Sequence, residues 1–308
     1  LGVGSGYHGE QTGRVMVSYE RHVLDHRPDA VIVVGDVNST LAAALVSVKL
    51  EIPVAHVEAG LRSGDWSMPE EVNRVLVDRV SSWLFTPSQD ANENLKNEGI
   101  APSRVHLVGN VMIDTMKQIL PAARAGFARL QKELDLPTRY GVLTLHRPSN
   151  VDSIDDLQPI LGAIAEISRH IEILFSVHPR TRRQLEQISA SGSSSIRYLE
   201  PLGYRDFLGL MDGSSLALTD SGGIQEETSV LGIPCLTLRP TTERPITCEF
   251  GTNRVVGTDP GQIVAAAIEA LGDERRPAQI PLWDGHAAER MAAILLNDLA
   301  IGGAVGCA

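Results

Sequence analysis

Short apolar segments that alternate with helical patterns constrain the fold of this chain more than any other feature. Ten such segments are rich in Val, Ile and Leu and do not alternate with polar residues. Strands buried on both faces of a parallel sheet have this composition, and helices cover such sheets, so the pattern predicts an α/β fold. The segments span residues 30–34, 54–57, 83–86, 105–108, 141–145, 171–177, 196–199, 215–218, 235–238 and 254–256.

Two domains are expected, because ten strands are many for one sheet in a chain of 308 residues. We predict an N-terminal Rossmann-like domain at residues 1–116 and a C-terminal Rossmann-like domain at residues 117–283, joined by the long helical stretch 111–134. The helical segment 284–308 is expected to pack back on the first domain. No apolar strand precedes residue 30, so we expect the first domain to lack its N-terminal strand or strands.

Composition excludes several classes of protein. The formal net charge of −11 disfavours a general nucleic-acid binder, which would normally carry a basic surplus. We find no signal peptide and no apolar span of transmembrane length, so we expect a cytoplasmic enzyme with no membrane partner. The three cysteines, Cys235, Cys248 and Cys307, have neither a disulfide framework nor metal-ligand spacing.

A Ser-Gly-Gly turn separates an apolar segment from a helical pattern at Ser221, Gly222 and Gly223. The start of a helix favours an anion, and glycine lets a phosphate approach the backbone closely. Glu227 lies about one turn further on the same helix face, where its carboxylate could accept two ribose hydroxyls. The segment predicts a sugar-nucleotide site; a glycine turn that only packs a helix on a sheet remains the alternative.

Polar residues follow several predicted strands directly or within three residues, namely Asp36, Glu58, His146, His178 and Ser221. Ligands bind beyond the carboxyl ends of strands in open parallel sheets. If the edges of two sheets face each other, these groups line an interdomain cleft with two carboxylates, two imidazoles and an anion-binding turn. Each residue alone has a simpler reading, as a helix cap or as hydrogen-bonded structure.

Two further segments carry charged residues at element ends. Pro69 suits the start of a helix, and Glu70 and Glu71 suit its first turn by charge alone, which suffices to explain Glu71. A later loop contains Arg239 and Arg244, and it follows another strand near the Ser-Gly-Gly turn. Such a loop could reach a diphosphate bidentately, or it could be a solvated Pro-rich loop.

Together these residues resemble the non-hydrolysing UDP-N-acetylglucosamine 2-epimerases of bacteria and archaea. The resemblance covers essentially the whole chain and implies the two-Rossmann-domain, glycosyltransferase-B-type architecture, with a cleft between the domains. It also implies interconversion of UDP-GlcNAc and UDP-ManNAc, by elimination of UDP to a 2-acetamidoglucal and re-addition. The matching segments, in the family's order, are GDVNST at 35–40, HVEAGLR at 56–62, PEEVNR at 69–74, DSGGIQEE at 220–227 and TERP at 242–245.

The resemblance also implies residue roles and partners. It requires no cofactor and no metal, and it suggests a UDP-sugar ligand and a homodimer formed through first-domain helices, at 38–50 or 72–81. The implied catalytic residues are Asp36, Glu58, Glu70 and His146. The implied UDP-binding residues are Phe207, Ser221, Gly222, Gly223, Glu227 and Arg244, to which we add Arg147 and His178 at neighbouring strand ends.

Three departures from the family pattern bear on these expectations. The family's early Gly-Thr-Arg-Pro-Glu loop is absent, and with it an expected diphosphate contact. The usual HRREN appears as HRPSN at 146–150, which weighs against the allosteric UDP-GlcNAc site of bacterial members. A frequent Gln of the uridine-side loop is Leu202.

Four alternative functions stay open. They are a hydrolysing 2-epimerase that releases UDP and ManNAc, an epimerase for a modified sugar such as a 2,3-diacetamido uronic acid, a glycosyltransferase of the same fold, and a sugar-nucleotide sensor. The acid and base roles of the carboxylates also stay open.

Overall fold

The chain forms two compact units, each built on its own parallel sheet. The computed structural model describes residues 1–186, 188 and 196–300. One unit contains Leu1–Asp114 and the described residues from Pro281 on, and the other contains Thr115–Ile280. All ten predicted strands occur within the described residues, each within one residue of its expected ends, which confirms the α/β class. The last part of the predicted helical segment 284–308 lies outside the described residues.

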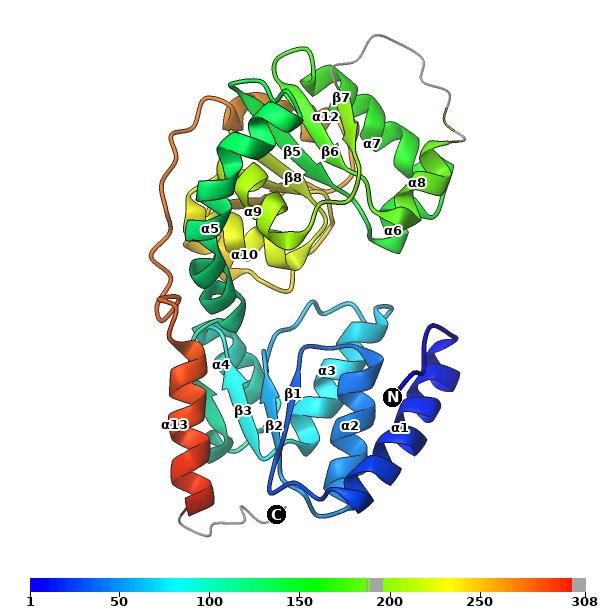
Figure 1. The fold of residues 1–308 in the computed structure, drawn as a ribbon, viewed down its shortest axis with the longest axis vertical. Coiled ribbons are helices and arrows are strands. Elements are labelled where there is room, and N and C mark those ends of the chain that lie inside the picture. The colour runs from blue at the N-terminus through cyan, green and yellow to red at the C-terminus, as the bar shows by residue number, and fades with distance from the viewer. Residues whose placement is uncertain (187, 189–195, 301–308) are drawn as a thin grey trace. The chain divides into compact units, whose positions relative to one another are not determined.

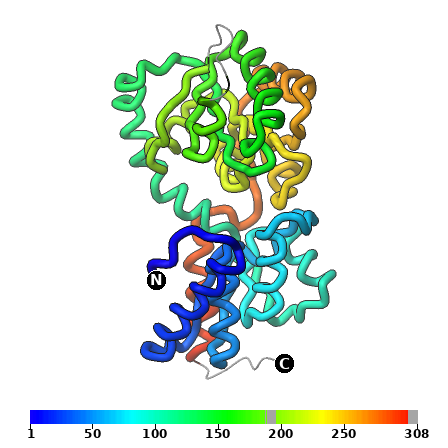
Figure 2. The backbone as a smooth tube through the Cα atoms, turned by 90° about the vertical axis from the view of Figure 1, so that its right-hand side faces the viewer, coloured from blue at the N-terminus to red at the C-terminus, as the bar shows by residue number. Residues whose placement is uncertain are grey.

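The first unit has a four-stranded sheet in the order β1-β2-β3-β4. Helix α1 lies alongside α2 in both views of the chain (Figures 1 and 2). The strands are β1 (Val31–Val34), β2 (Val54–Val57), β3 (Trp83–Thr86) and β4 (Val105–Leu107). The helices are α1 (His8–Asp25), α2 (Asn38–Lys49), α3 (Pro69–Val80), α4 (Gln89–Asn97), the short η1 (Pro102–Arg104) and α13 (Ala287–Ala300).

Helices cover the first sheet on both faces, except at one edge. Residues of α2 and α3 pack with Val33 and Val54 on one face, and Leu295 of α13 packs with Trp83 of β3 on the other. The expectation that every strand is buried on both faces is wrong for β1, where Ile32 is 58% exposed. The physical reason is its position: β1 is an edge strand, and the apolar cluster under α13 contains β2 and β3 residues instead.

The second unit has a six-stranded sheet in the order β10-β9-β8-β5-β6-β7. If the strands are numbered 1 to 6 in chain order from β5 and the sheet is read from β7 to β10, the order is 3-2-1-4-5-6. This is the strand order of the Rossmann fold. The strands are β5 (Tyr140–Thr144), β6 (Glu172–Ser176), β7 (Ile196–Leu199), β8 (Leu216–Thr219), β9 (Cys235–Thr237) and β10 (Asn253–Val255). The helices are α5 (Val111–Glu133), which starts in the first unit and enters the second at Thr115, α6 (Pro148–Val151), α7 (Ile154–Ile167), α8 (Pro179–Leu185), α9 (Tyr204–Asp212), α10 (Gly222–Leu231), α11 (Ile246–Glu249) and α12 (Pro260–Ala270).

The strand order reverses between β5 and β8, and predicted site residues of the second unit follow these two strands. The two strands are paired, and the hydroxyls of Thr144 and Thr219 at their ends lie 2.7 Å apart. The loop that begins with His146 and the turn that begins with Ser221 therefore leave the sheet side by side, at the position where doubly wound folds bind ligands. None of the described helices is long and apolar enough to cross a membrane.

Candidate functional site

The loops after β1 and β2 carry two of the predicted catalytic carboxylates in the first unit. Glu58 follows β2 directly and has a φ of +68°. This left-handed conformation costs a residue with a side chain about 1–2 kcal/mol, so the surrounding contacts must hold it. Asp36 follows β1 after Gly35, whose φ is also +68°.

A buried aspartate connects these two loops. Asp78 on α3 is fully buried and accepts hydrogen bonds from His56 Nδ1 at 2.6 Å and from the Gly60 amide at 3.1 Å. Arg62 pairs with the same carboxylate at 2.8 Å. The other ring nitrogen of His56, Nε2, lies 2.9 Å from the carbonyl oxygen of Gly35. Both partners of His56 are acceptors, so the ring satisfies both only as an imidazolium.

The charge of Asp78 is stabilised in this position. Burial alone would raise the pKa of the Asp78 carboxyl, but the His56 hydrogen bond, followed by the charges of His56 and Arg62, lowers it below its usual range. The ionised carboxylate therefore anchors the loop that contains Glu58 and, through His56, the loop that contains Asp36.

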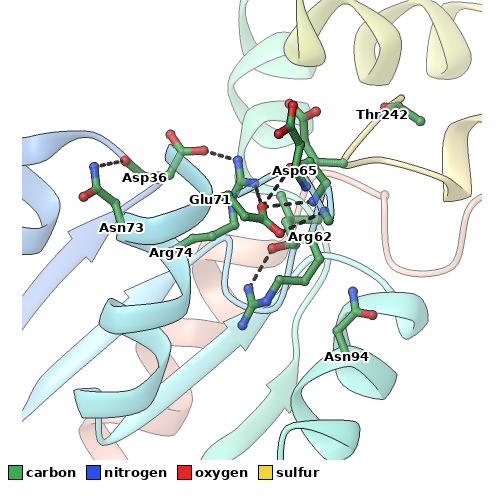
Figure 3. A network of polar contacts seen from close by, with 12 residues as sticks. Asp36, Arg62, Asp65, Glu71, Asn73, Arg74, Asn94 and Thr242 are labelled. Atoms are coloured by element: carbon green, nitrogen blue, oxygen red, sulfur yellow. Dashed lines mark hydrogen bonds and ion pairs between the residues drawn. The ribbon is translucent and has the colours of Figure 1, made fainter. Parts of the chain in front are cut away.

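A second network holds the Asp36 side chain. Arg74 is buried on α3 and pairs with Asp36 and Glu71 (Figure 3). Glu71 is buried and accepts hydrogen bonds from the amides of Ser63 at 3.0 Å and Gly64 at 2.9 Å. The interpretation of Glu71 as an acid placed only by the helix start is therefore wrong, because its carboxylate fixes the loop before α3.

Asp36 and Glu70 line one hollow of about 420 Å³ within the first unit. Gln11, Asn38 and Asn73 add amide groups to its wall. The side chain of Asp36 is 31% exposed, so a ligand can reach it. The structure thus brings two of the predicted acids together, and Glu58 lies on the neighbouring loop outside the wall of this hollow.

In the second unit, the buried carboxylate of Asp220 joins the β5 loop to the β8 loop. It accepts hydrogen bonds from the amides of His146 at 3.0 Å and Arg147 at 2.9 Å, and from Asn150 Nδ2 at 3.2 Å. His146 Nδ1 lies 2.8 Å from the same carboxylate. Burial would raise the pKa of Asp220, but its contacts with His146 lower it. The predicted residues His146 and Arg147 are therefore held by a residue to which we had assigned no role.

His146, His178 and Phe207 line a second hollow of about 220 Å³ in this unit. The two imidazole rings have centroids 6.0 Å apart. His178 also caps α8, because its Nδ1 accepts a hydrogen bond from the amide of Arg180 at 3.2 Å. His178 therefore caps a helix, as one reading of the sequence proposed, and it also lines the hollow. Leu202, which replaces a frequent Gln, lies in the same wall.

A cluster of three arginines and two glutamates lies beside the start of α10; we call it the arginine cluster. Its centre is the buried carboxylate of Glu243, which pairs with Arg244 at 2.6 Å, Arg239 at 2.8 Å and Arg147 at 3.3 Å. Arg244 also pairs with buried Glu226 at 2.7 Å. The formal charges of these five side chains sum to +1, and the helix start adds positive potential, so the cluster favours an anion.

The two glycines of the turn have different surroundings. A Cβ atom on Gly222 would lie 2.4 Å from Arg244 Nη1, whereas a Cβ on Gly223 would meet nothing within 4 Å. Gly222 is therefore needed for the close approach of a guanidinium. The backbone at Gly223 is the part of the turn that remains open to a ligand phosphate.

Replacing Glu243 with Gln is expected to lower the free energy of unfolding by about 3–5 kcal/mol at pH 7, because the buried arginines lose their shared counter-charge. Burial would raise the pKa of Glu243, but the charges of Arg244 and Arg239 lower it far below its usual range. The carboxylate therefore stabilises the fold above its unfolded pKa of about 4.3, and this stabilisation is lost as the pH falls below that value.

Urea unfolding from pH 7 down to pH 4 tests this expectation. The difference between wild type and Glu243→Gln should be largest at pH 7 and should begin to narrow near pH 4. Glu249→Gln, at an exposed glutamate on α11, is the matched control and should change little. A Glu243→Gln variant as stable as the control would contradict the role of Glu243 as the centre of the cluster.

Glu227 lies on α10 and is buried. Its Oε1 accepts a hydrogen bond from the Tyr204 hydroxyl at 2.6 Å. Burial raises the pKa of Glu227, and the Tyr204 hydrogen bond opposes that rise. Sequence reasoning missed Tyr204, as it missed Asp78, Arg74 and Glu243, because each also contacts a partner more than 15 residues away along the chain. Two opposite-charge spacings were local signals: Glu71 and Arg74, three residues apart on one helix, and Arg239 and Glu243, four residues apart in one loop.

The fold and these groups define a class: an α/β protein with two parallel-sheet units, of the kind found in enzymes of nucleotide sugars. The family model for UDP-N-acetylglucosamine 2-epimerase matches residues 1–296. The chain belongs to this family.

Individual relatives agree with the family. A UDP-N-acetylglucosamine 2-epimerase of Methanocaldococcus jannaschii is 44% identical over 307 residues, which cover 96% of this chain and 82% of the relative. A crystal structure of that organism's enzyme in complex with UDP-GlcNAc and UDP has a TM-score of 0.90 at 43% identity, covering 96% of this chain and 83% of that one. A UDP-2,3-diacetamido-2,3-dideoxy-D-glucuronate 2-epimerase of Pseudomonas aeruginosa is 38% identical, over 96% of this chain and 82% of the relative.

Proposed function

We propose that this protein is a non-hydrolysing epimerase that inverts C2 of UDP-N-acetylglucosamine to give UDP-N-acetylmannosamine. The observation that carries the proposal is the anion-binding arginine cluster near the buried Glu227 in the second unit; the first unit separately contains a hollow lined by Asp36 and Glu70. The family and the M. jannaschii relative, both named for UDP-N-acetylglucosamine 2-epimerase, support epimerisation of this sugar nucleotide.

The chemistry explains why carboxylates are sufficient. The C2 proton of the sugar is hardly acidic, but departure of UDP from C1 leaves an oxocarbenium-like carbon that acidifies it. The C1–O bond breaks with its electron pair leaving on UDP, a carboxylate takes the C2 proton, and a C1=C2 double bond forms. A second acid then returns a proton to the opposite face of C2, and the diphosphate oxygen re-forms the bond to C1. Asp36, Glu58 and Glu70 are the proposed acids and bases, and His146 is a further candidate.

The second unit is proposed to hold UDP. Arg147, Arg244 and the turn at Ser221–Gly223 neutralise the diphosphate and stabilise it as it leaves. Glu227 accepts hydrogen bonds from the ribose. The hollow lined by His178 and Phe207 offers an apolar ring surface of the kind that a base stacks on.

Two finer points belong to the same proposal. A modified UDP-sugar is the second candidate substrate, favoured by the similarity to the P. aeruginosa enzyme for a diacetamido sugar acid. We also propose a homodimer formed through helices of the first unit, where Leu76 of α3 is 44% exposed.

Incubation with UDP-GlcNAc in D2O, followed by NMR, tests the reaction. UDP-ManNAc that carries deuterium at C2 is the expected product. Free ManNAc together with UDP would indicate the hydrolysing reaction. Consumption of UDP-GlcNAc only after an acceptor is added, with no deuterium at C2, would indicate a glycosyltransferase. Exchange only with a diacetamido uronic acid substrate would indicate the second candidate.

A further inference from the structure

The carboxylate of Glu227 has a protein donor that nothing in the proposed reaction accounts for. Tyr204 is the first residue of α9, and its hydroxyl donates to Glu227 Oε1 at 2.6 Å. Tyr204 is 38% exposed as a residue, while its hydroxyl points to a buried acid. Burial, together with the hydrogen bond and charge of Glu227, raises the pKa of Tyr204, so the phenol keeps its proton and acts as the donor.

This contact fixes one oxygen of the acid and so sets the direction of the other. A carboxylate has two oxygens and accepts several hydrogen bonds, so a bond from Tyr204 to Oε1 is compatible with a ligand hydroxyl on Oε2. The same bond favours the charged form of a carboxylate whose burial favours the neutral form. A ligand hydroxyl therefore meets an oriented carboxylate, and the ionised form that the Tyr204 bond favours is the stronger kind of acceptor.

We propose that Tyr204 is a positioning residue for nucleotide recognition: its hydroxyl holds the Glu227 carboxylate in the orientation that accepts a ribose hydroxyl. This inference rests on the proposed function, because it takes a uridine diphosphate as the ligand. The residue contributes to the choice of a ribonucleotide over a nucleotide without ribose hydroxyls. A merely structural contact would instead only join α9 to α10.

Binding of UDP and of 2′,3′-dideoxy-UDP, measured by calorimetry, separates these two roles. A hydrogen bond to a charged group contributes about 1.5–3 kcal/mol, so wild type should bind UDP roughly 10–100-fold more tightly than the dideoxy nucleotide. Tyr204→Phe should weaken UDP binding by about tenfold and leave dideoxy-UDP binding within about twofold of wild type. The preference for ribose should therefore fall in this variant.

The pH dependence of binding and a control variant make the test specific. UDP binding that depends on an ionised Glu227 is lost as the pH falls through the pKa of that acid. Without the Tyr204 bond this pKa is higher, so the loss should begin at a higher pH in Tyr204→Phe than in wild type. Tyr198→Phe, at a half-exposed tyrosine on β7, is the matched control and should change neither binding nor its pH dependence.

Several outcomes would overturn the inference. Equal weakening of both nucleotides in Tyr204→Phe, with a lower melting temperature, would show a structural contact only. An unchanged ribose preference, or tighter UDP binding, would show that Tyr204 does not position the acid or that it competes with the ribose. Glu227→Gln tests the acceptor independently, since full ribose preference in that variant would exclude Glu227. If wild type bound neither nucleotide, the proposed function itself would fail.

Discussion

Glu58→Gln is expected to lower the rate of deuterium exchange at C2 by at least about 100-fold while leaving UDP affinity nearly unchanged. The amide cannot take or return a proton, and Glu58 belongs to the first unit, whereas the proposed UDP-binding residues belong to the second. The exchange rate by NMR and UDP affinity by calorimetry check the two parts separately. Glu93→Gln, at an exposed glutamate on α4, is the control and should keep full activity.

The backbone at Glu58 allows a stricter version of this test. Its φ of +68° suits glycine better than glutamate, so Glu58→Gly relieves about 1–2 kcal/mol of strain and loses about 0.5–1 kcal/mol to the greater freedom of the unfolded chain. On these backbone terms alone the variant should be about as stable as wild type, and it should be inactive. Such a result would show that the carboxylate is kept at this position for chemistry. Full turnover in either variant would exclude Glu58 as a catalytic residue.

Asp78→Asn is expected to lower the free energy of unfolding by about 3–5 kcal/mol at pH 7. The substitution keeps the shape of the side chain but removes the charge that His56 and Arg62 share in a fully buried position. Because the same carboxylate anchors the loops that carry Asp36 and Glu58, exchange at C2 should fall as well. Urea unfolding and the exchange assay on the same preparations measure both effects.

The pH dependence gives Asp78→Asn a second readout. The pKa of Asp78 is lowered in the folded protein, so its stabilisation is complete above the unfolded pKa of about 3.9 and is lost as the pH falls below that value. The stability difference from wild type should therefore hold between pH 7 and pH 5 and begin to narrow near pH 4. Asp25→Asn, at an exposed aspartate, is the control. If the buried pairs of Asp78 with His56 and Arg62 contributed nothing to the free energy of unfolding, Asp78→Asn would be as stable as this control. That result would contradict the prediction.

The strands could be predicted from sequence because burial on both faces leaves a local mark, a run of Val, Ile and Leu. The same argument failed at β1, because a run such as Val31–Val34 does not reveal whether a helix covers both sides of the strand. The strand order of the second sheet was also not readable. Pairing of β5 with β8, for example, joins segments more than 70 residues apart.

Part of the candidate site was predictable for a similar reason. Acids and imidazoles that directly follow apolar segments, such as Asp36 and His146, stand where parallel sheets bind ligands. The residues that hold them were not predictable, because their contacts are made only in the folded chain: His56 meets Asp78 22 residues away, and Arg147 meets Glu243 96 residues away. Whether a glutamate is a solvated helix-start acid or a buried anchor, as at Glu71, depends on such contacts.

The uncovered side of β1 has a practical consequence for work with this polypeptide. Ile32 and Val34 are 58% and 50% exposed, and β1 pairs only with β2 among the described strands. An open strand edge with apolar side chains is a template on which a second chain can add a strand. Such association between molecules increases with protein concentration. Rates should therefore be measured on dilute samples that light scattering shows to be free of aggregates.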